Sequence, residues 1–406
     1  MTHRVLVIGG GMVGWAFAIA AQRALPQARV TVLEAKPIPD GNPDPLDTRA
    51  SALNLASRSI LTAWNAWPAL EAQAGVIEQI HVSNQGRFGS SLLTPSDIGQ
   101  SPLGYVVENH IIGRALKAIA DGLGIELVAP AEVASLDSDG VAPRVTLSDG
   151  SSMVADLVIV ADGNQSTLRS QLGVAVDRRQ TGQCALVANV SFAGPQQHIA
   201  FERFTAEGPL ALLPLTDAYA GQRRFNVVWS MAADRAQSML SGDDAGFVAG
   251  LQRAFGWRLG AIIATGRRSA WILDRTQARE QVRRGFVVAG NAAHGLHPVA
   301  GQGLNLSLRD AATLGLVLAE AANNGASLSD PSVLQRYTAL TDDDQALTVA
   351  ATDLLSTLFE RRGPALDLPR DAALIGLDML SPLRRYIARR GTGLSIAPVW
   401  SGEEGL

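Results

Sequence analysis

A turn of three glycines near the N-terminus has the spacing of a dinucleotide-binding site. It reads Gly9-x-Gly11-x-x-Gly14 and follows the apolar run Val5 to Ile8, which is typical of a parallel strand buried on both faces. Gly9 would permit a tight turn, and Gly11 would let the backbone approach a pyrophosphate. Gly14 would let the following helix pack closely on the strand. The spacing therefore predicts a site for the phosphates of a dinucleotide.

The residues after this turn complete the pattern. Gly14 to Leu25 is expected to form a helix that Pro26 stops, and Val30 to Leu33 a second buried strand. The N-terminus of the helix would offer unpaired N–H groups and a positive dipole end to the phosphates. Glu34 ends the second strand, where its carboxylate would accept hydrogen bonds from an adenosine ribose. Strand, turn, helix, strand and acid together indicate an adenine dinucleotide.

Two later segments have the same form, an apolar strand followed by a turn with glycine. Leu157 to Val160 leads into Asp162-Gly163, with Arg169 downstream, and Phe286 to Ala289 leads into Gly290-Asn291. Each run is short and apolar, as expected of a buried parallel strand. The chain therefore carries three such turns, far apart in sequence.

The third turn contains two histidines that have to be weighed as metal ligands. His294 and His297 lie three residues apart, but no His, Cys or acid cluster near them supplies a third and a fourth ligand. We therefore expect no metal, and a structural role for both histidines. Pro298 follows, and Gly301 and Gly303 precede a long helix expected from 304 to 323.

Composition narrows the class of protein. Of the 406 residues 47% are hydrophobic and 18% charged, which describes a well-buried globular protein long enough for two lobes. A net charge of −4 gives no general reason to bind nucleic acid, and the single cysteine, Cys184, excludes an internal disulfide framework. A charge-poor stretch follows Arg4 like a secretory signal, but its glycines would weaken a membrane helix, so we expect no membrane span.

The distribution of apolar runs and turn residues along the chain predicts three parts. The apolar strands and glycine turns assign 1–75, 101–178 and 272–330 to one discontinuous cofactor domain. Residues 76–100 and 179–271 contain alternating or apolar β-type runs separated by Gly, Pro and Asp, which predict an inserted antiparallel sheet. Within the first part we expect a helix over 58–70 and a small antiparallel meander over 127–154. Residues 331–406 are expected to be mostly helical.

Four separated motifs resemble the ubiquinone-biosynthesis hydroxylases, which belong to the flavoprotein monooxygenases of the p-hydroxybenzoate hydroxylase type. The resemblance extends from about residue 4 to residue 320 and is nearest to the 2-polyprenyl-6-methoxyphenol hydroxylase branch. The motifs are Asp47-Thr48-Arg49-Ala50-Ser51-Ala52-Leu53, Leu103-Gly104-Tyr105-Val106-Val107-Glu108, Glu202-Arg203-Phe204-Thr205 with Gly208-Pro209-Leu210-Ala211-Leu212-Leu213-Pro214, and His297-Pro298 with Gly301-Gln302-Gly303-Leu304-Asn305.

The resemblance implies a fold and a set of binding residues. The fold is α/β, with a Rossmann-like FAD-binding domain, an inserted antiparallel-sheet substrate domain and a C-terminal helical region. FAD is implied to be bound without a covalent link, and NADPH or NADH to donate electrons without a Rossmann domain of its own. The implied cofactor residues are Gly9, Gly11, Met12, Val13, Gly14, Glu34, Arg49, Arg114, Asp162, Asn291, Gly301, Gly303, Leu304 and Asn305. The implied substrate-pocket residues are Leu213, Pro214, Trp229, His297 and Pro298.

No side chain is expected to carry the oxygen chemistry, because in this family a flavin C4a-hydroperoxide delivers the oxygen. The backbone at Pro298 and at Gly301 to Gly303 would pass close to the isoalloxazine edge. The helix from Leu304 would then point its positive end at the part of the ring that is negative when reduced. The apolar runs 210–215 and 225–229 would form a dry wall over the flavin.

The chain departs from the family pattern at two places. The wider family carries Gly-Asp where this chain has Gly290-Asn291. An asparagine carbonyl still accepts a hydrogen bond from a ribityl hydroxyl, and Gly-Asn is associated with the methoxyphenol branch, so we interpret it as a mark of subtype. In the tail, Gly391-Thr392-Gly393 replaces a Met-Gly pair common in relatives.

The implied function is ring hydroxylation of a polyprenyl phenol with O2. Two alternatives remain open: a hydroxylase of another apolar phenol, and a flavoprotein that binds lipid or partner proteins without oxygenating anything. We expect a cytoplasmic protein. Because its substrate partitions into lipid, it would meet the inner face of the membrane or a ubiquinone-biosynthesis complex.

A segment of the tail could make that contact. The segment from Leu377 to Leu394 has the pattern of a basic amphipathic helix, which suits an anionic surface. A helix edged with arginine and packed on the cofactor domain explains the pattern equally well. The apolar residues concerned are Leu377, Met379, Leu380, Leu383 and Ile387, and the basic ones Arg384, Arg385, Arg389 and Arg390.

Overall fold

The computed structural model describes residues 2–37, 44, 46–87, 89–138, 142–216, 222–296, 301–360, 376 and 380–394. Of the residues singled out above, His297, Pro298, Leu377 and Met379 lie outside this part of the chain, so the predictions for them stay predictions.

A six-stranded sheet of order β21-β22-β12-β1-β2-β8 forms the centre of the first lobe. All neighbouring strands are parallel except β21 and β22. Val5 and Val7 of β1 pack on one face and Leu6 and Ile8 on the other, which is why the strand is a continuous apolar run. The strands are β1 (Arg4–Ile8), β2 (Arg29–Leu33), β8 (Glu126–Val128), β12 (Leu157–Val160), β21 (Val282–Arg283) and β22 (Phe286–Val288).

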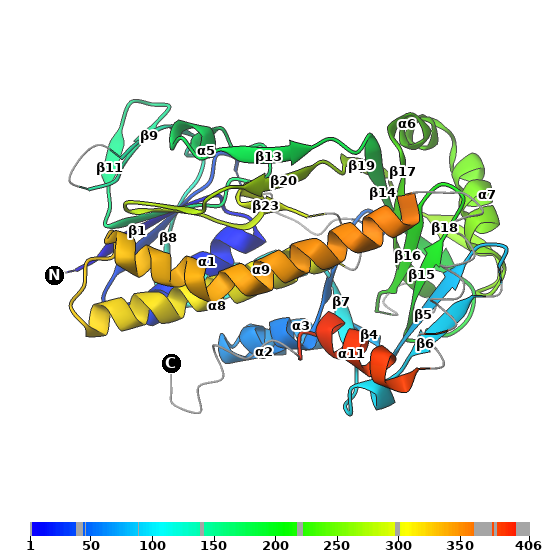
Figure 1. Ribbon diagram of the computed structural model, residues 1–406. Coiled ribbons are helices and arrows are strands. Elements are labelled where there is room, and N and C mark those ends of the chain that lie inside the picture. The colour runs from blue at the N-terminus through cyan, green and yellow to red at the C-terminus, as the bar shows by residue number, and fades with distance from the viewer. Residues whose placement is uncertain are drawn as a thin grey trace.

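Helices cover one face of this sheet, and a small sheet covers the other. The helices are α1 (Met12–Ala24), α4 (Asn109–Gly122), α8 (Gln302–Asn323) and α9 (Pro331–Glu360). Figure 1 shows α9 returning along α8. The opposite face packs against the antiparallel strands β9 (Val133–Asp137), β10 (Arg144–Leu147) and β11 (Ser152–Val154).

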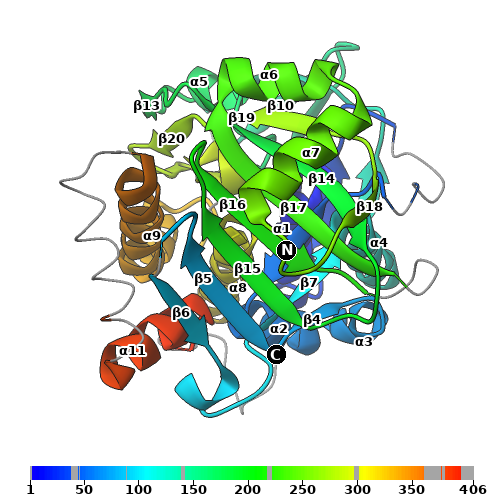
Figure 2. The ribbon, with the colours of Figure 1, turned by 90° about the vertical axis from the view of Figure 1, so that its right-hand side faces the viewer.

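An eight-stranded sheet forms the second lobe, and its strands are antiparallel except for the pair β15 and β5. The helices α6 (Ala233–Ser241) and α7 (Asp244–Phe255) cover one face, and in Figure 2 they lie in front of it. The other face is turned toward the first lobe (Figure 1). The strands are β5 (Gln79–Asn84), β6 (Ser90–Leu93), β14 (Gln183–Phe192), β15 (Ile199–Phe204), β16 (Pro209–Pro214), β17 (Arg223–Ala232), β18 (Ile262–Thr265) and β19 (Ser269–Ile272).

Shorter elements complete the described part of the fold. The strands are β3 (Ala50–Leu53), β4 (Gly75–Ile77), β7 (Gly104–Glu108), β13 (Val176–Arg179), β20 (Arg275–Ala278) and β23 (His294–Gly295). The helices are α2 (Leu55–Ala63), α3 (Trp67–Glu71), α5 (Thr167–Gln171), α11 (Ser381–Gly391) and the short 3-10 turns η1 (Pro95–Asp97) and η2 (Gly290–Ala292). The division of the chain into a cofactor domain, an inserted domain and a C-terminal helical region stays a prediction.

The structure corrects three details of the predicted elements. The helix expected over 58–70 is two helices, because Asn65 takes a left-handed conformation with φ 61° and ends the first. The meander expected over 127–154 is present as β9, β10 and β11, but its first expected run, 127–136, is two strands, because β8 belongs to the parallel sheet and only β9 pairs with β10. Helices α6 and α7 were not predicted. The glycines at 246 and 250 weaken the helical signal of α7, and polar residues weaken that of α6.

A buried chain of polar side chains joins the two lobes. Arg224 of β17 donates from Nη2 to Oε1 of Glu108 at 2.7 Å, and the Thr48 hydroxyl donates to the same oxygen. Asn189 donates from Nδ2 to the Thr48 hydroxyl at 2.8 Å, and Asn226 donates from Nδ2 to the side-chain Oδ1 of Asn189 at 2.8 Å. Because every one of these polar side chains is buried, their hydrogen bonds stabilise the two lobes in one relative position.

This polar chain makes the Arg224 side chain a sensitive position. Arg224→Met leaves the Glu108 carboxylate buried without its cation, so we expect the free energy of unfolding to fall by about 3–5 kcal/mol. The matched control is Arg29→Met, which removes a pair with Glu126 whose side chains are 67% and 43% exposed, and should cost about 0–1 kcal/mol. Urea titration measures both values, and equal losses in the two variants would contradict the role of the buried pair.

Candidate functional site

The three glycine turns meet at one edge of the parallel sheet. They follow β1, β12 and β22, which are neighbours in the sheet, so the turns lie side by side at the carboxyl ends of the strands. Gly9 has φ 111°, and a Cβ on it would lie 2.5 Å from the carbonyl oxygen of Ala161. A Cβ on Gly290 would lie 2.6 Å from Cγ1 of Val13. Segments distant in sequence thus form one continuous surface.

The first turn has the shape of a phosphate cradle. A Cβ on Gly14 would lie 1.8 Å from the Gly9 carbonyl oxygen, so helix and strand are in direct backbone contact. A Cβ on Gly11 would meet no atom within 4 Å, so the space beside this residue is open. Gly11 is the N-cap of α1 and leaves that helix end without a side-chain cap. An open helix N-terminus of this kind fits a pyrophosphate.

Glu34 lies against the same turn. Its Oε2 accepts a hydrogen bond from the Gly10 N–H at 2.7 Å, and its Oε1 accepts one from the Lys36 N–H at 3.0 Å. Each carboxylate oxygen accepts two hydrogen bonds, so both keep a site for a ribose hydroxyl. The predicted assignment of Glu34 to the adenosine ribose is compatible with this geometry. Met12 and Val13 begin α1, where their N–H groups belong to the uncapped first turn.

An arginine joins the second turn to the third. Arg169 is buried, and its Nη1 donates to the Ala292 carbonyl oxygen at 2.6 Å. Asn291 precedes that residue and has an exposed side chain with no hydrogen-bond partner among the described residues. This side chain is therefore available to a ribityl hydroxyl, and that role stays a prediction. Partial desolvation raises the pKa of Asp162, against the opposing effects of Ser166 and Arg169.

The start of α8 carries the remaining predicted glycines. Gly301 caps the helix with φ 58°, and a Cβ on it would lie 3.1 Å from the Ala52 Cβ of β3. A Cβ on Gly303 would meet nothing within 4 Å. This helix end is therefore also open to a ligand, while Leu304 packs its side chain against the first-lobe core and can contribute only its backbone.

The Asn305 side chain is held by protein groups, so contact of this residue with FAD stays a prediction for its backbone alone. Its amide is fully engaged by protein groups, so it has no hydrogen-bonding capacity left for a cofactor. It instead fixes the α8 start against β3 and α2. Its Oδ1 accepts from the Asn54 N–H at 2.9 Å and the Ser57 hydroxyl at 2.7 Å, and its Nδ2 donates to the carbonyl oxygens of Ala52 at 2.9 Å and Gly301 at 2.8 Å.

The two predicted cofactor arginines are exposed and lie on different elements. The Arg49 guanidinium lies over the Trp271 ring of β19 at 4.6 Å from its centroid, and so bridges the first lobe to the second. Arg114 lies on the exposed side of α4. For both residues, contact with FAD stays a prediction.

The predicted substrate residues of the eight-stranded sheet do not all lie on the same face of that sheet. Trp229 is only 1% exposed and packs in the core beneath α6 and α7, so the structure contradicts its assignment to the pocket. Leu213 is half-buried on the opposite face and packs against the first-lobe core. Pro214 is buried at the end of β16. The neighbour of Trp229 that faces the first lobe is Val228, because side chains alternate along a strand.

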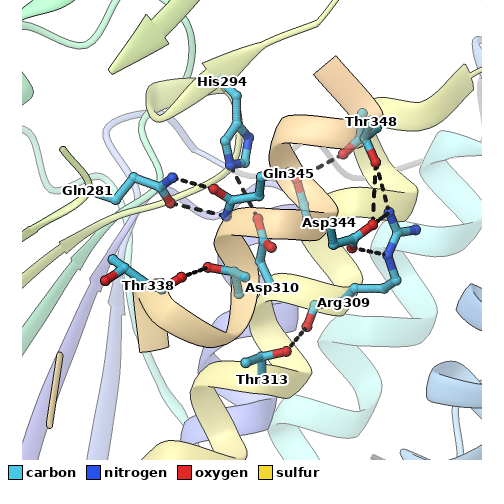
Figure 3. Close-up of polar contacts among 12 residues, drawn as sticks. Gln281, His294, Arg309, Asp310, Thr313, Thr338, Asp344, Gln345 and Thr348 are labelled. Carbon is cyan, nitrogen blue, oxygen red and sulfur yellow. Dashed lines mark hydrogen bonds and ion pairs between the residues drawn. The ribbon is translucent and has the colours of Figure 1, made fainter. Parts of the chain in front are cut away.

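His294 is part of a buried polar cluster that sequence reasoning missed. Its Nε2 lies 3.3 Å from Oδ2 of Asp310 on α8 (Figure 3), with the two side chains 5% and 2% exposed. Arg309, the residue before Asp310 on α8, donates from Nε to Oδ2 of Asp344 on α9 at 2.6 Å. Asp310, five residues after Asn305, was the one sequence signal of this cluster. Its partner His294 lies sixteen residues earlier, in a turn whose shape the sequence does not predict. In the described residues no group of three His, Cys, Asp or Glu side chains could hold a metal.

The open space at Gly11 gives a direct test of FAD binding. Gly11→Glu would place a side chain and a negative charge where the pyrophosphate is expected, so the purified variant should lose its flavin and yellow absorbance. The matched control is Gly122→Glu at the exposed end of α4, where a Cβ also meets nothing within 4 Å. Full flavin absorbance in Gly11→Glu would remove this turn from the site.

Comparisons with known proteins agree with this geometry. Residues 2–346 match the family model described as FAD binding domain. The chain is 34% identical over 404 residues to ubiquinone hydroxylase UbiL of Rhodospirillum rubrum, with 97% of this chain and 90% of that protein covered. It is 30% identical over 395 residues to 3-demethoxyubiquinol 3-hydroxylase of Escherichia coli, with 96% and 98% covered.

A solved structure shares the fold. The p-nitrophenol 4-monooxygenase PnpA of Pseudomonas putida superimposes with a TM-score of 0.78 at 18% identity, over 98% of this chain and 99% of that one. The predicted α/β fold of the p-hydroxybenzoate hydroxylase type is therefore confirmed. With its family match and its two near full-length relatives, the chain belongs to the FAD-binding family of flavoprotein monooxygenases.

Proposed function

We propose that this protein hydroxylates the aromatic ring of a polyprenyl phenol or methoxyphenol of ubiquinone biosynthesis, with FAD, O2 and NADH or NADPH. Two relatives that match nearly its whole length have names from that pathway, ubiquinone hydroxylase and 3-demethoxyubiquinol 3-hydroxylase. The observation that carries the proposal is the convergence of three glycine turns at one sheet edge, opposite a sheet from the second lobe.

The residues of the chain would bind and orient the cofactor, and FAD supplies the oxygen chemistry once reduced. The α1 N-terminus at Gly11 would hold the pyrophosphate, Glu34 the adenosine ribose and Asn291 the ribityl chain. The N-terminus of α8, beyond Gly301, would direct its positive end at the isoalloxazine. The first-lobe-facing side of the large sheet, with Leu213 and Val228, would exclude water from the reacting atoms.

The two alternatives make different predictions about the product. A hydroxylase of another apolar phenol would leave quinone synthesis intact, and a lipid-binding flavoprotein would make no hydroxylated product at all. In cells that lack this protein we expect a polyprenyl phenol short of one ring hydroxyl to accumulate, because the enzyme that consumes it is missing. Mass spectrometry of lipid extracts measures it, with the same cells carrying the restored gene as control. Unchanged quinone intermediates would contradict the proposal.

We also propose that α11 contacts an anionic lipid surface, through which a polyprenyl substrate would enter. Leu383, Tyr386 and Ile387 are exposed on this helix, and the exposed Arg385 and Arg389 flank them. This combination of apolar and basic side chains suits a headgroup region. In the described part of the chain no helix is long and apolar enough to span a bilayer.

The other side of α11 is occupied by protein contacts. Arg384 donates from Nε to Oδ1 of the buried Asp97 at 2.7 Å, and the Thr392 carbonyl oxygen accepts from the Leu55 N–H at 3.1 Å. Arg384 therefore has a packing role, and it should be left intact when the lipid surface is tested. Of the two explanations of the basic segment, packing on the cofactor domain then applies to Arg384, and contact with an anionic surface is proposed for Arg385 and Arg389.

The lipid contact is tested by the double variant Arg385→Gln/Arg389→Gln. Each arginine near an anionic surface contributes about 1 kcal/mol, so sedimentation with phosphatidylglycerol vesicles should weaken at least roughly tenfold. Turnover of a soluble short-chain phenol should be unchanged, and pure phosphatidylcholine vesicles serve as the control surface. If the parent protein does not bind the anionic vesicles, or the double variant binds them equally well, a partner protein must present the lipid instead.

A further inference from the structure

One row of residues across the large sheet is half-buried although the sheet around it is buried. Direct cross-strand pairs connect Val82 to Glu202, Glu202 to Ala211, Ala211 to Val228 and Val228 to Val187. All five residues retain accessible surface. The row runs over β5, β15, β16, β17 and β14, and so forms a continuous lane of accessible side chains.

This lane faces the first lobe. Ala200 and Leu213 project from the same side of their strands as the lane, and both pack into the first-lobe core. Phe201 and Leu212 project from the other side and pack beneath α6 and α7. Accessible surface on the inner side of a sheet that otherwise contacts another lobe indicates that the lane borders unfilled space on that side.

Glu202 is the single ionisable side chain of the lane. It has no hydrogen-bond or ion-pair partner in the described part of the chain. The adjacent Arg203 points the other way and donates to the Ala254 carbonyl oxygen at 3.0 Å and the Ser83 hydroxyl at 3.3 Å. Burial among apolar side chains raises the pKa of the Glu202 carboxyl to about 7. An ionised acid without a partner on a desolvated apolar surface destabilises the fold, and such groups are candidates for a function.

We propose that Glu202 is a catalytic residue that accepts the proton of the substrate's phenolic hydroxyl. This inference rests on the proposed hydroxylation of a phenol. In the step, the phenolic O–H bond breaks and its proton forms a bond to a Glu202 oxygen, which gives a neutral carboxylic acid and a phenolate. The charge spreads from the phenolate oxygen to the ring carbons and makes them more nucleophilic toward the transferred oxygen. After hydroxylation the proton returns to the product oxygen, so Glu202 is regenerated.

The environment of Glu202 suits this transfer. A carboxyl that titrates about pH 7 is half ionised at neutral pH, and it is closer in basicity to a phenolate, whose acid has a pKa of about 10, than an ordinary glutamate is. The rest of the lane is Val82, Ala211, Val228 and Val187, which would contact the apolar parts of a substrate without competing for its hydroxyl. One base on an apolar surface also fixes which way the ring lies.

The test is Glu202→Gln, which keeps the shape of the side chain and cannot accept the proton. We expect bound FAD and the slow oxidation of NADH or NADPH without substrate to be unchanged. Hydroxylated product should fall by roughly a hundredfold in kcat at pH 7. The rate in the variant should rise as the pH approaches the phenol's own pKa of about 10, because the substrate then ionises without help. The control is Glu78→Gln on the exposed surface beside β5, which should match the parent enzyme.

Thermal unfolding supplies a second readout that does not depend on turnover. The folded-state pKa of Glu202 is raised, so its contribution to stability is present at low pH and is lost as the pH rises from about 4.5 to about 7. Glu202→Gln should therefore match the parent in Tm near pH 4.5 and exceed it at pH 8. An unchanged kcat and pH profile in the variant would overturn the catalytic role. If the parent hydroxylates no polyprenyl phenol while the Tm difference follows pH as stated, the proposed substrate is wrong and the desolvated placement of Glu202 stands.

Discussion

A buried ion pair joins the two lobes, and the geometry of the candidate site depends on it. Arg224 of the large sheet and Glu108 at the end of β7 are both shielded from water, with 2.7 Å between the bonded nitrogen and oxygen. Neither charge is tolerated alone there, so the sheet is stable against the first lobe in one register. Thr48 shares the Glu108 oxygen, and the β3 strand that follows it offers the Ala52 carbonyl to Asn305 of α8. One series of contacts thus connects the wall of the candidate cavity to the helix end that would face the flavin.

The cofactor turn was predictable because its causes are local. Gly9 needs its positive φ and Gly14 its backbone contact within a few residues of the chain, and only glycine satisfies both. The strands at 5–8, 157–160 and 286–288 are apolar throughout because both faces of the parallel sheet are covered, which leaves a sequence pattern that needs no knowledge of the partners. Three such strands followed by glycine identified the turns, and the order of the strands in the sheet then showed that the turns meet.

The remaining features depend on partners that are distant in the chain. Arg224 and Glu108 are 116 residues apart, and nothing near either residue indicates the other. Trp229 was assigned to the wrong face because almost all of β17 is buried, so its sequence does not reveal which alternate residues face the first lobe. Asn305 was assigned to the cofactor because it lies in a cofactor motif, whereas three of its four side-chain hydrogen bonds go to residues 52–57 and the fourth to its own helix start. Glu202 stood in a recognised motif, but only the register of the strands shows that it stands alone on an accessible apolar lane.

The candidate site therefore combines a cradle for FAD from the first lobe with an apolar wall, bearing one base, from the second. Incubation of the FAD-loaded protein with NADH or NADPH, isotope-labelled O2 and a short-chain polyprenyl phenol is the most direct measurement. Mass spectrometry should find one labelled oxygen atom in a new ring hydroxyl of the product. Oxidation of the nicotinamide without labelled product, whatever phenol is supplied, would contradict the assignment of this site to aromatic hydroxylation.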